Sequence, residues 1–486
     1  MVADNSPNTD FFNLCNAQLM MWFDARVSNS SGYRLGGWLK TEQHFDASTL
    51  RKAMRVLAQS HEALRLRLDP DQPRQWIVKD CEAPLNVLEI QSDDPDAAFK
   101  AHLDQMFADP MPFGDSPLWR VDLLQISNIS YVALSFHHII VDTVSVQIAL
   151  SHLLQAYLSI LGGQTDIKLP TSSVRPLVES DLSYNTSQQF QADLTYWSER
   201  YSTVPPRLIT APTTPSEDPF ATITFRNIPA NIGFPAAAEA ANLLPHRALF
   251  GILAVVLARR FGQTDLSCGL ALHRRDRNSL NSVAMLAGLI PLRATFEDWW
   301  SLYDCVAAFD EHIDEDLRHN RLPLDALYRE IGLTGKNARG LFDVTMSYVL
   351  GTGGFALPNG STSSIIETRE ASPISFHATN DPKTGDFSYR LAVNPEYKGI
   401  VNAEALADSL DKTIADFSAG EWVDFTEVEA LSFSEVKTLT TLATPTPLAI
   451  DDLDAALLPA RIAAHASTTP NAPALAEASG APISYA

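Results

Sequence analysis

The sequence of 486 residues is poor in cysteine and in positive charge. Its four cysteines lie far apart and form no C-x-x-C pair, which excludes a disulfide framework and disfavours a zinc site (Cys15, Cys81, Cys268 and Cys305). The 36 lysines and arginines against 58 aspartates and glutamates give a formal net charge of −22, so we expect no nucleic-acid and no membrane partner. We find no uninterrupted apolar run long enough to span a bilayer and no signal sequence over residues 1–10. These features predict a cytoplasmic protein.

The rest of the composition is typical of a folded protein with more than one domain. Hydrophobic residues make up 45% of the sequence, and the length predicts two or three domains. Stretches of strand-like and helix-like periodicity alternate, which predicts an α/β (α+β) fold. Polar or proline-bearing stretches at 162–176 and 438–447 predict boundaries. We therefore divide the chain into lobes over 1–170 and 171–432, a linker over 433–455 and a terminal piece over 456–486.

The segment most informative about function reads Ser-Phe-His-His-Ile-Ile-Val-Asp-Thr-Val-Ser at residues 135–145. A predicted strand, Tyr131–Phe136, ends at His137 and His138, and Asp142 precedes a predicted helix over Val144–Leu161. Two imidazoles at a strand end with a nearby carboxylate suit proton-handling acyl chemistry. The spacing His-x-x-x-Asp is typical of acyltransferases that use thioesters. Taken alone, His138 is more often a core histidine, and Asp142 fits a helix N-cap.

Other segments give a coarse secondary structure. Helical patterns cover 50–58, His246–Phe261 and Ala403–Phe417, and strand patterns cover Leu64–Leu68, Leu118–Ile126, Leu266–Leu272, Phe342–Leu350 and Phe387–Val393. The Gly- and Ser-rich run Gly351–Ser364 predicts a flexible loop, because no Gly-Lys-Ser/Thr follows it as in a phosphate cradle. A basic cluster of Arg274, Arg275 and Arg277 is a candidate contact for a phosphate or a carrier protein.

Six segments in order along the chain resemble the motifs of nonribosomal peptide synthetase condensation domains. They are Ala17–Trp22, Ser60–Arg65, Pro112-Phe113 with Pro117–Arg120, His137–Thr143, Ala284–Arg293 and Phe342–Tyr348. The fourth matches the family motif His-His-x-x-x-Asp-Gly except that Thr143 replaces glycine. Together the segments cover roughly residues 14–430. Residues 461–465 and 469–475 resemble the opening of an adenylation domain.

The resemblance implies two chloramphenicol-acetyltransferase-like lobes in a V arrangement with a central tunnel. It implies amide formation by transfer of an acyl group from a thioester to an amine, with no intrinsic cofactor and no metal. Acyl-coenzyme A is the expected donor, and the phosphopantetheine arm of a carrier protein is the expected acceptor tether. Few residues precede the first motif, and no Gly-Gly-x-Ser carrier site lies upstream, so we favour a starter, N-acylating domain. The expected partners are the adenylation and carrier domains of the same synthetase, and the expected state is a monomer.

The resemblance also assigns roles to residues. His138 is the catalytic residue, as a general base or as an orienting group, and His137 is structural. An arginine holds Asp142, for which Arg65 is our candidate, with Arg67 and Arg293 as alternatives. Thr143 and Gly288 are expected to line the acceptor channel, and threonine resists a positive φ that glycine permits. Ala284 and Gly288 replace the family's Gly and Asn.

Three other interpretations stay open. The first is an elongating condensation domain fed by an upstream carrier. The second is a stand-alone alcohol acyltransferase of the plant type, although its Asp-Phe-Gly-Trp-Gly motif is absent from the sequence. The third is a catalytically silent platform that binds a partner enzyme, which the retained His138 and Asp142 disfavour.

Overall fold

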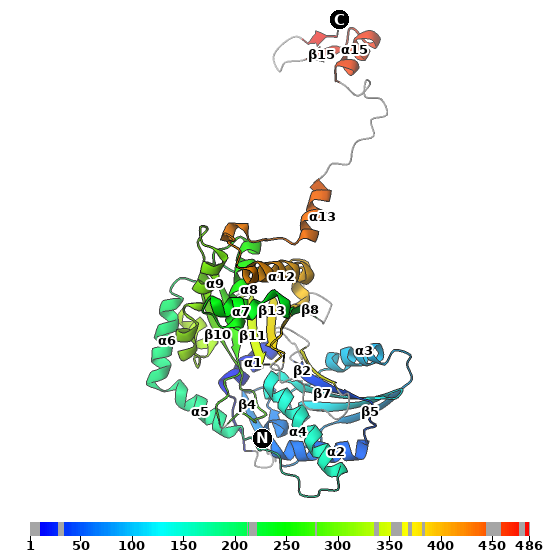
Figure 1. Ribbon diagram of the computed structural model, residues 1–486, viewed down its shortest axis with the longest axis vertical. Helices are drawn as coiled ribbons and strands as arrows, with labels where there is room; N and C mark the ends of the chain where they lie inside the picture. The colour runs from blue at the N-terminus through cyan, green and yellow to red at the C-terminus, as the bar shows by residue number, and fades with distance from the viewer. Residues whose placement is uncertain are drawn as a thin grey trace, which may run out of the picture. The chain divides into compact units, whose positions relative to one another are not determined.

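A computed structural model describes residues 10–27, 34–210, 212, 221–277, 279–334, 340–350, 362–367, 372–381, 384–443, 458–475 and 482–485. The chain divides into two units, Met1–Ser432 and Phe433–Ala486. The described part of the first unit holds two mixed β-sheets flanked by helices, which confirms the predicted α/β class (Figure 1). The predicted lobe boundaries and the tunnel stay predictions.

The first sheet has the strand order β12–β2–β7–β6–β5. Its strands are β2 (Arg34–Thr41), β5 (Leu85–Ile90), β6 (Trp119–Ile126), β7 (Ile129–His137) and β12 (Thr362–Glu367). The edge strand β12 comes from far along the chain and pairs antiparallel with β2. Residues 362–367, which fall within the predicted second lobe, therefore complete a sheet whose other strands all lie within the predicted first lobe.

Helices cover both faces of this sheet (Figure 1). α2 (Ala47–Ser60) and α4 (Thr143–Leu161) pack in the buried cluster on one face, and α3 (Pro95–Ala108) packs in the cluster on the other. α2 begins where the Asp46 carboxylate accepts the N–H of Thr49 at 2.7 Å, and Leu50, Met54 and Leu57 follow at helical spacing on its buried face. The cap and the periodicity thus place α2 where the sequence predicts a helix over 50–58.

α4 confirms the predicted helix. Among the described residues it has by itself the length and mean hydropathy of a membrane span, although polar residues such as Ser145, Gln147 and His152 interrupt its apolar run. Its Val146, Leu150 and Leu153 are buried in the same cluster as residues of α2 and the sheet. This packing accounts for the apolar character of the helix.

Two segments differ from their predicted structure. The alternation at Leu64–Leu68 predicted a strand, but Glu62–Arg65 forms the 3-10 helix η1, and Leu66–Leu68 alone forms β3. Strand β3 joins β1 (Phe12–Asn13) and β4 (Arg74–Ile77) in a small sheet. The predicted linker begins as helix α13 (Phe433–Ala443), where the hydroxyl of Thr438 donates to the Ser434 carbonyl. Its continuation at 444–455 lies outside the described residues.

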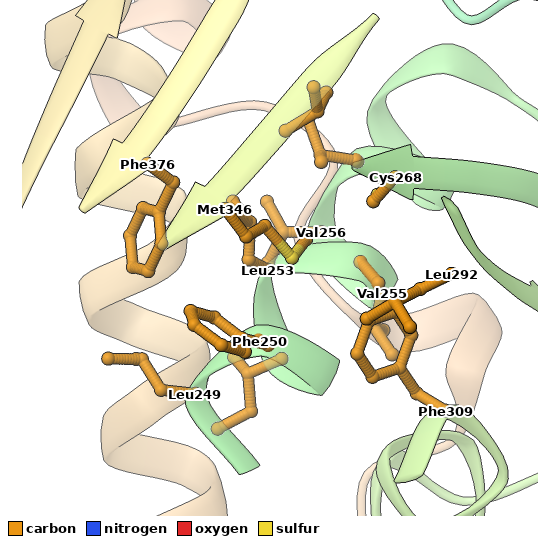
Figure 2. Close-up of a cluster of buried hydrophobic side chains, with 14 of the residues drawn as sticks. Leu249, Phe250, Leu253, Val255, Val256, Cys268, Leu292, Phe309, Met346 and Phe376 are labelled. Atoms are coloured by element: carbon orange, nitrogen blue, oxygen red, sulfur yellow. The ribbon is translucent and has the colours of Figure 1, made fainter. Parts of the chain in front are cut away.

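The second sheet has the order β10–β9–β11–β13–β14–β8. Its strands are β8 (Thr222–Ile228), β9 (Asp265–Leu272), β10 (Gly288–Thr295), β11 (Val344–Leu350), β13 (Ile374–Asn380) and β14 (Phe387–Val393). The core helix α8 (Pro245–Phe261) is buried continuously over residues 248–258. Figure 2 shows Phe250 of α8 beside Phe376 of β13, and Val255 beside Leu292 of β10. A central helix buried on all sides explains why its sequence lacks a polar face.

The remaining helices connect or cover these layers. They are α1 (Asn16–Val27), α5 (Arg175–Asn185), α6 (Gln188–Arg200), α7 (Phe234–Ala240), α9 (Leu302–Asp310), α10 (Ile313–Arg318), α11 (Leu324–Glu330) and α12 (Ala403–Ala419). The described part of the second unit contains α13, α15 (Leu458–Thr468), and the paired strands β15 (Pro473–Leu475) and β16 (Ile483–Ser484).

Candidate active site around His138

His138 lies where β7 ends and the short 3-10 helix η2 (His138–Ile140) begins. Its Nδ1 is 2.8 Å from the carbonyl oxygen of Val141. Because a carbonyl oxygen can only accept, Nδ1 carries the hydrogen, and the lone pair of the neutral ring lies on Nε2. The side chain is half-buried, whereas its neighbours His137 and Ile139 are buried. The turn therefore presents one oriented imidazole with Nε2 as its accepting atom.

His137 has a different environment. Its Nδ1 accepts the backbone N–H of Ile139 at 3.1 Å, so this ring helps to close the 3-10 turn. Burial lowers the pKa of His137 to about 3, and the nearby positive charge of Arg34 on β2 adds to this effect. A neutral, buried ring in this position fits the structural role expected for His137.

Asp142 is the N-cap of α4 and also half of a buried ion pair. Its carboxylate accepts the N–H of Ser145 at 2.8 Å. It faces Arg275, whose Nη1 and Nη2 lie 2.7 and 2.8 Å from the two carboxylate oxygens. The backbone N–H of Leu286 adds a fourth hydrogen bond at 3.2 Å. The N-cap interpretation and the arginine interpretation of Asp142 are both correct.

The prediction that Arg65 holds Asp142 is wrong. Arg65 ends η1, and its guanidinium donates to the carbonyl oxygens of Ala58 at 3.0 Å and Val78 at 3.1 Å. The two alternatives are also wrong, because Arg67 donates to the Asp115 carbonyl and Arg293 pairs with Asp265. The partner comes instead from the basic cluster Arg274, Arg275 and Arg277. Nothing in the sequence distinguishes Arg275 from its neighbours, since 133 residues separate it from Asp142.

Gln18 on α1 is a positioning residue that the sequence analysis did not identify. Its side-chain amide donates to the carbonyl of Ile139 within η2 at 3.1 Å. Gln18 is buried and is paired with the side chain of Gln75 on β4. The segment Ala17–Trp22 carries this glutamine within a family-like motif, which is the signal in the sequence that points to it. Gln18 thus binds the turn that carries His138 through the carbonyl of Ile139.

Thr143 and Gly288 occupy positions that explain their residue types. Thr143 is the first residue of α4 and is not among the residues with positive φ, so threonine fits its backbone without strain. At Gly288 an added Cβ would lie 2.1 Å from the guanidinium carbon of Arg274. Gly288 thus permits close packing of Arg274, and its place in an acceptor channel stays a prediction.

Residues 172–174, just before α5, are bound to the segment Ser60–Arg65. The Glu62 carboxylate accepts the hydroxyl of Ser173 at 2.6 Å and the N–H of Val174 at 2.9 Å. The buried His61 ring contacts the Ser172 hydroxyl at 2.9 Å and the ring of His152 on α4 at 3.0 Å. This motif therefore secures the chain between the two predicted lobes.

The arrangement suits proton transfer at a single imidazole. Within the described ranges, no group of three or more His, Cys, Asp or Glu side chains could hold a metal ion. With its hydrogen on Nδ1, the His138 ring can accept a proton or a hydrogen bond at Nε2, and the buried Asp142–Arg275 pair fixes the backbone beside it. These features support acid–base chemistry and orientation by His138.

Comparison with known proteins agrees with this geometry. A family model described as "Condensation domain" matches residues 8–401. The dimodular nonribosomal peptide synthase of Bacillus subtilis (strain 168) is 24% identical over 338 residues, which cover 68% of this chain and 14% of that protein. Surfactin synthase subunit 1 of the same organism is 22% identical over 70% of this chain and 10% of its own length. The chain thus spans a small fraction of the curated relatives it matches.

Solved structures share the fold. The starter condensation domain of rhizomide synthetase, solved as a mutant with C8-CoA, has a TM-score of 0.73 at 21% identity over 87% of this chain and 98% of that chain. The first condensation domain of the calcium-dependent antibiotic synthetase has a TM-score of 0.71 at 19% identity over 87% of this chain and 100% of that chain. At these identities the likeness extends to the fold alone.

Proposed function

Because this chain belongs to the Condensation domain family, we propose that it transfers an acyl group from acyl-coenzyme A to the amine of a carrier-bound aminoacyl thioester. Amide formation by acyl transfer is the reaction of this family. The observation that carries the proposal is the orientation of His138, whose Nδ1 donates to the Val141 carbonyl and leaves the lone pair on Nε2. The acyl-coenzyme A donor, the aminoacyl acceptor and the carrier protein that holds the acceptor are all part of what we propose.

The reaction follows from this orientation. The amine nitrogen attacks the thioester carbonyl, a C–N bond forms, and a zwitterionic tetrahedral species results. His138 Nε2 hydrogen-bonds the attacking nitrogen and takes the ammonium proton. Collapse breaks the C–S bond, and the thiolate leaves with the proton that His138 returns. The products are the amide and a free thiol, so no oxidant or metal enters the balance.

The choice of acyl-coenzyme A over a carrier-bound donor is supported by two features. The segments Ala284–Arg293 and Phe342–Tyr348 look more like those of starter domains. The fold is also similar to a starter domain solved with C8-CoA. The second candidate is an elongating domain that takes its donor from an upstream carrier.

Intact-mass spectrometry of the acceptor carrier tests the proposal. The protein is mixed with its aminoacyl-loaded carrier and either a panel of acyl-coenzyme A thioesters or acyl-loaded carriers. A mass gain of one acyl group from a coenzyme A donor supports the starter function. Gain from a loaded carrier alone would support the elongating alternative, and gain from neither would refute both.

Matched histidine variants test the residue. His138→Ala should abolish the mass gain, with far-UV circular dichroism and unfolding temperature close to those of the unmodified protein. His44→Ala, at an exposed position, is the control and should retain full transfer. Equal transfer by the two variants would show that His138 does not carry the reaction.

A further inference from the structure

The loop between β9 and β10 reaches from the second sheet into the first lobe. Its Val283 is fully buried in the hydrophobic cluster of α2, α4 and the first sheet. Every other buried member of that cluster, among the described residues, lies at or before Val178. The carbonyl of Val283 also accepts the hydroxyl of Ser172 at 3.2 Å. The loop is therefore part of the packing of the lobe that carries His138.

Ser145 on α4 binds this loop through all three hydrogen-bonding positions of its hydroxyl. The hydroxyl donates to the carbonyl of Ala284 at 2.7 Å. It accepts the N–H of Ala284 at 3.0 Å and Nη2 of Arg275 at 2.8 Å. Ser145 is fully buried, and Ala284 is 1% exposed, so water cannot replace these bonds. A hydroxyl has one hydrogen and two accepting lone pairs, and here each has a partner.

These hydrogen bonds connect Ser145 to the ring of His138 through a short series of contacts. Ser145 holds Arg275, and Arg275 holds Asp142 by two hydrogen bonds. Asp142 is the next residue after Val141, whose carbonyl orients the His138 ring. A shift of the loop would therefore move the carbonyl that sets the direction of Nε2.

We propose that Ser145 is a positioning residue that couples the β9–β10 loop to the orientation of His138. The proposal rests on the proposed function only in taking His138 as the reacting residue. Ser145 touches no reacting group and acts through Arg275, Asp142 and Val141. The backbone N–H of Ser145 donates to the Asp142 carboxylate, so replacing the side chain of Ser145 leaves that hydrogen bond in place.

Ser145→Ala is the main test, and Ser409→Ala is its matched control. Ser409 is also a fully buried helical serine, but its hydroxyl donates locally to the Ala405 carbonyl four residues back. We expect Ser145→Ala to lower kcat about tenfold or more with little change in KM for the donor, since small misplacements of a catalytic group are costly. Ser409→Ala should keep kcat within about twofold at a similar loss of unfolding temperature. Ser145→Cys, which retains a weaker donor and acceptor, should recover part of the rate.

Two readouts do not depend on acyl transfer. Hydrogen exchange of a peptide spanning residues 282–287 should accelerate in Ser145→Ala, because the N–H of Ala284 loses its acceptor. Carbethoxylation of His138 by diethyl pyrocarbonate, measured by peptide mass, should also accelerate relative to the exposed His465. If no donor supports transfer by the unmodified protein, the proposed function fails while these readouts still decide the coupling. Unchanged exchange and an unchanged His138 rate in the folded variant would overturn the proposal.

Discussion

The buried ion pair between Asp142 and Arg275 permits a quantitative prediction. The two side chains are 3% and 2% exposed, and the carboxylate has four hydrogen-bond donors. Asp142→Asn keeps an oxygen for the N-cap bond and removes the charge, while Arg275→Met keeps most of the aliphatic stem. Each single change leaves a buried charge without its partner, so we expect each to lower the free energy of unfolding by about 3–5 kcal/mol.

The double variant separates pairing from packing. Because it leaves neither charge uncompensated, it should be less destabilised than the sum of the single variants by about 3 kcal/mol. Urea denaturation of the four proteins, followed by tryptophan fluorescence, measures this coupling. The exposed pair Arg55–Glu82, at 58% and 73% exposure, is the control and should show a coupling of about 1 kcal/mol or less. A coupling for Asp142–Arg275 no larger than that of the control would refute the reasoning.

Three further predictions concern other buried groups. Burial, with a contribution from His152, lowers the pKa of His61 to about 3, so the unfolded chain binds more protons than the folded one below the ordinary value near 6.5. The contribution of this ring to the free energy of unfolding is fully present above that pH and falls as pH decreases, by about 2 kcal/mol at pH 5. His61→Asn should remove this part of the pH dependence of the free energy of unfolding, measured by urea denaturation. Gly288→Ala places a Cβ against Arg274 and should cost about 1–3 kcal/mol, less in an Arg274→Ala background. Arg65→Met should add to Asp142→Asn within about 0.5 kcal/mol in the same urea assay, because the two side chains share no partner.

For each of these three predictions, one outcome would contradict the physical reasoning. An acid slope identical in the variant and the parent would show that the His61 ring protonates normally in the folded state. An equal cost of the glycine substitution in both backgrounds would mean that the arginine does not restrict that position. A coupling above about 1 kcal/mol for the Arg65 variant would show contact with the carboxylate after all.

Local sequence determined much of the scaffold around the site. The apolar strand that ends at His137, the carboxylate of Asp142 as an N-cap and the apolar helix after it depend on residues within a few positions of one another. Hydrogen bonds of a cap and the periodicity of a buried face are short-range, so the sequence predicts β7 and α4 within two residues. The ordered motifs also identified the family, which the match over residues 8–401 confirms.

The packing of distant segments determines which side chains meet at the site. Arg275 and not Arg65 holds Asp142, Gln18 supports the turn of His138, and Ser145 joins a loop 139 residues further along the chain. Strand β12 likewise crosses to the sheet of the first lobe. Charge and hydrogen-bonding capacity do not specify a partner among several arginines or serines, because the partner is chosen by how the sheets and helices pack. Local residues and ordered motifs predict the turn of His138 and the family, whereas the packing of the two sheets determines which side chains hold that turn in place.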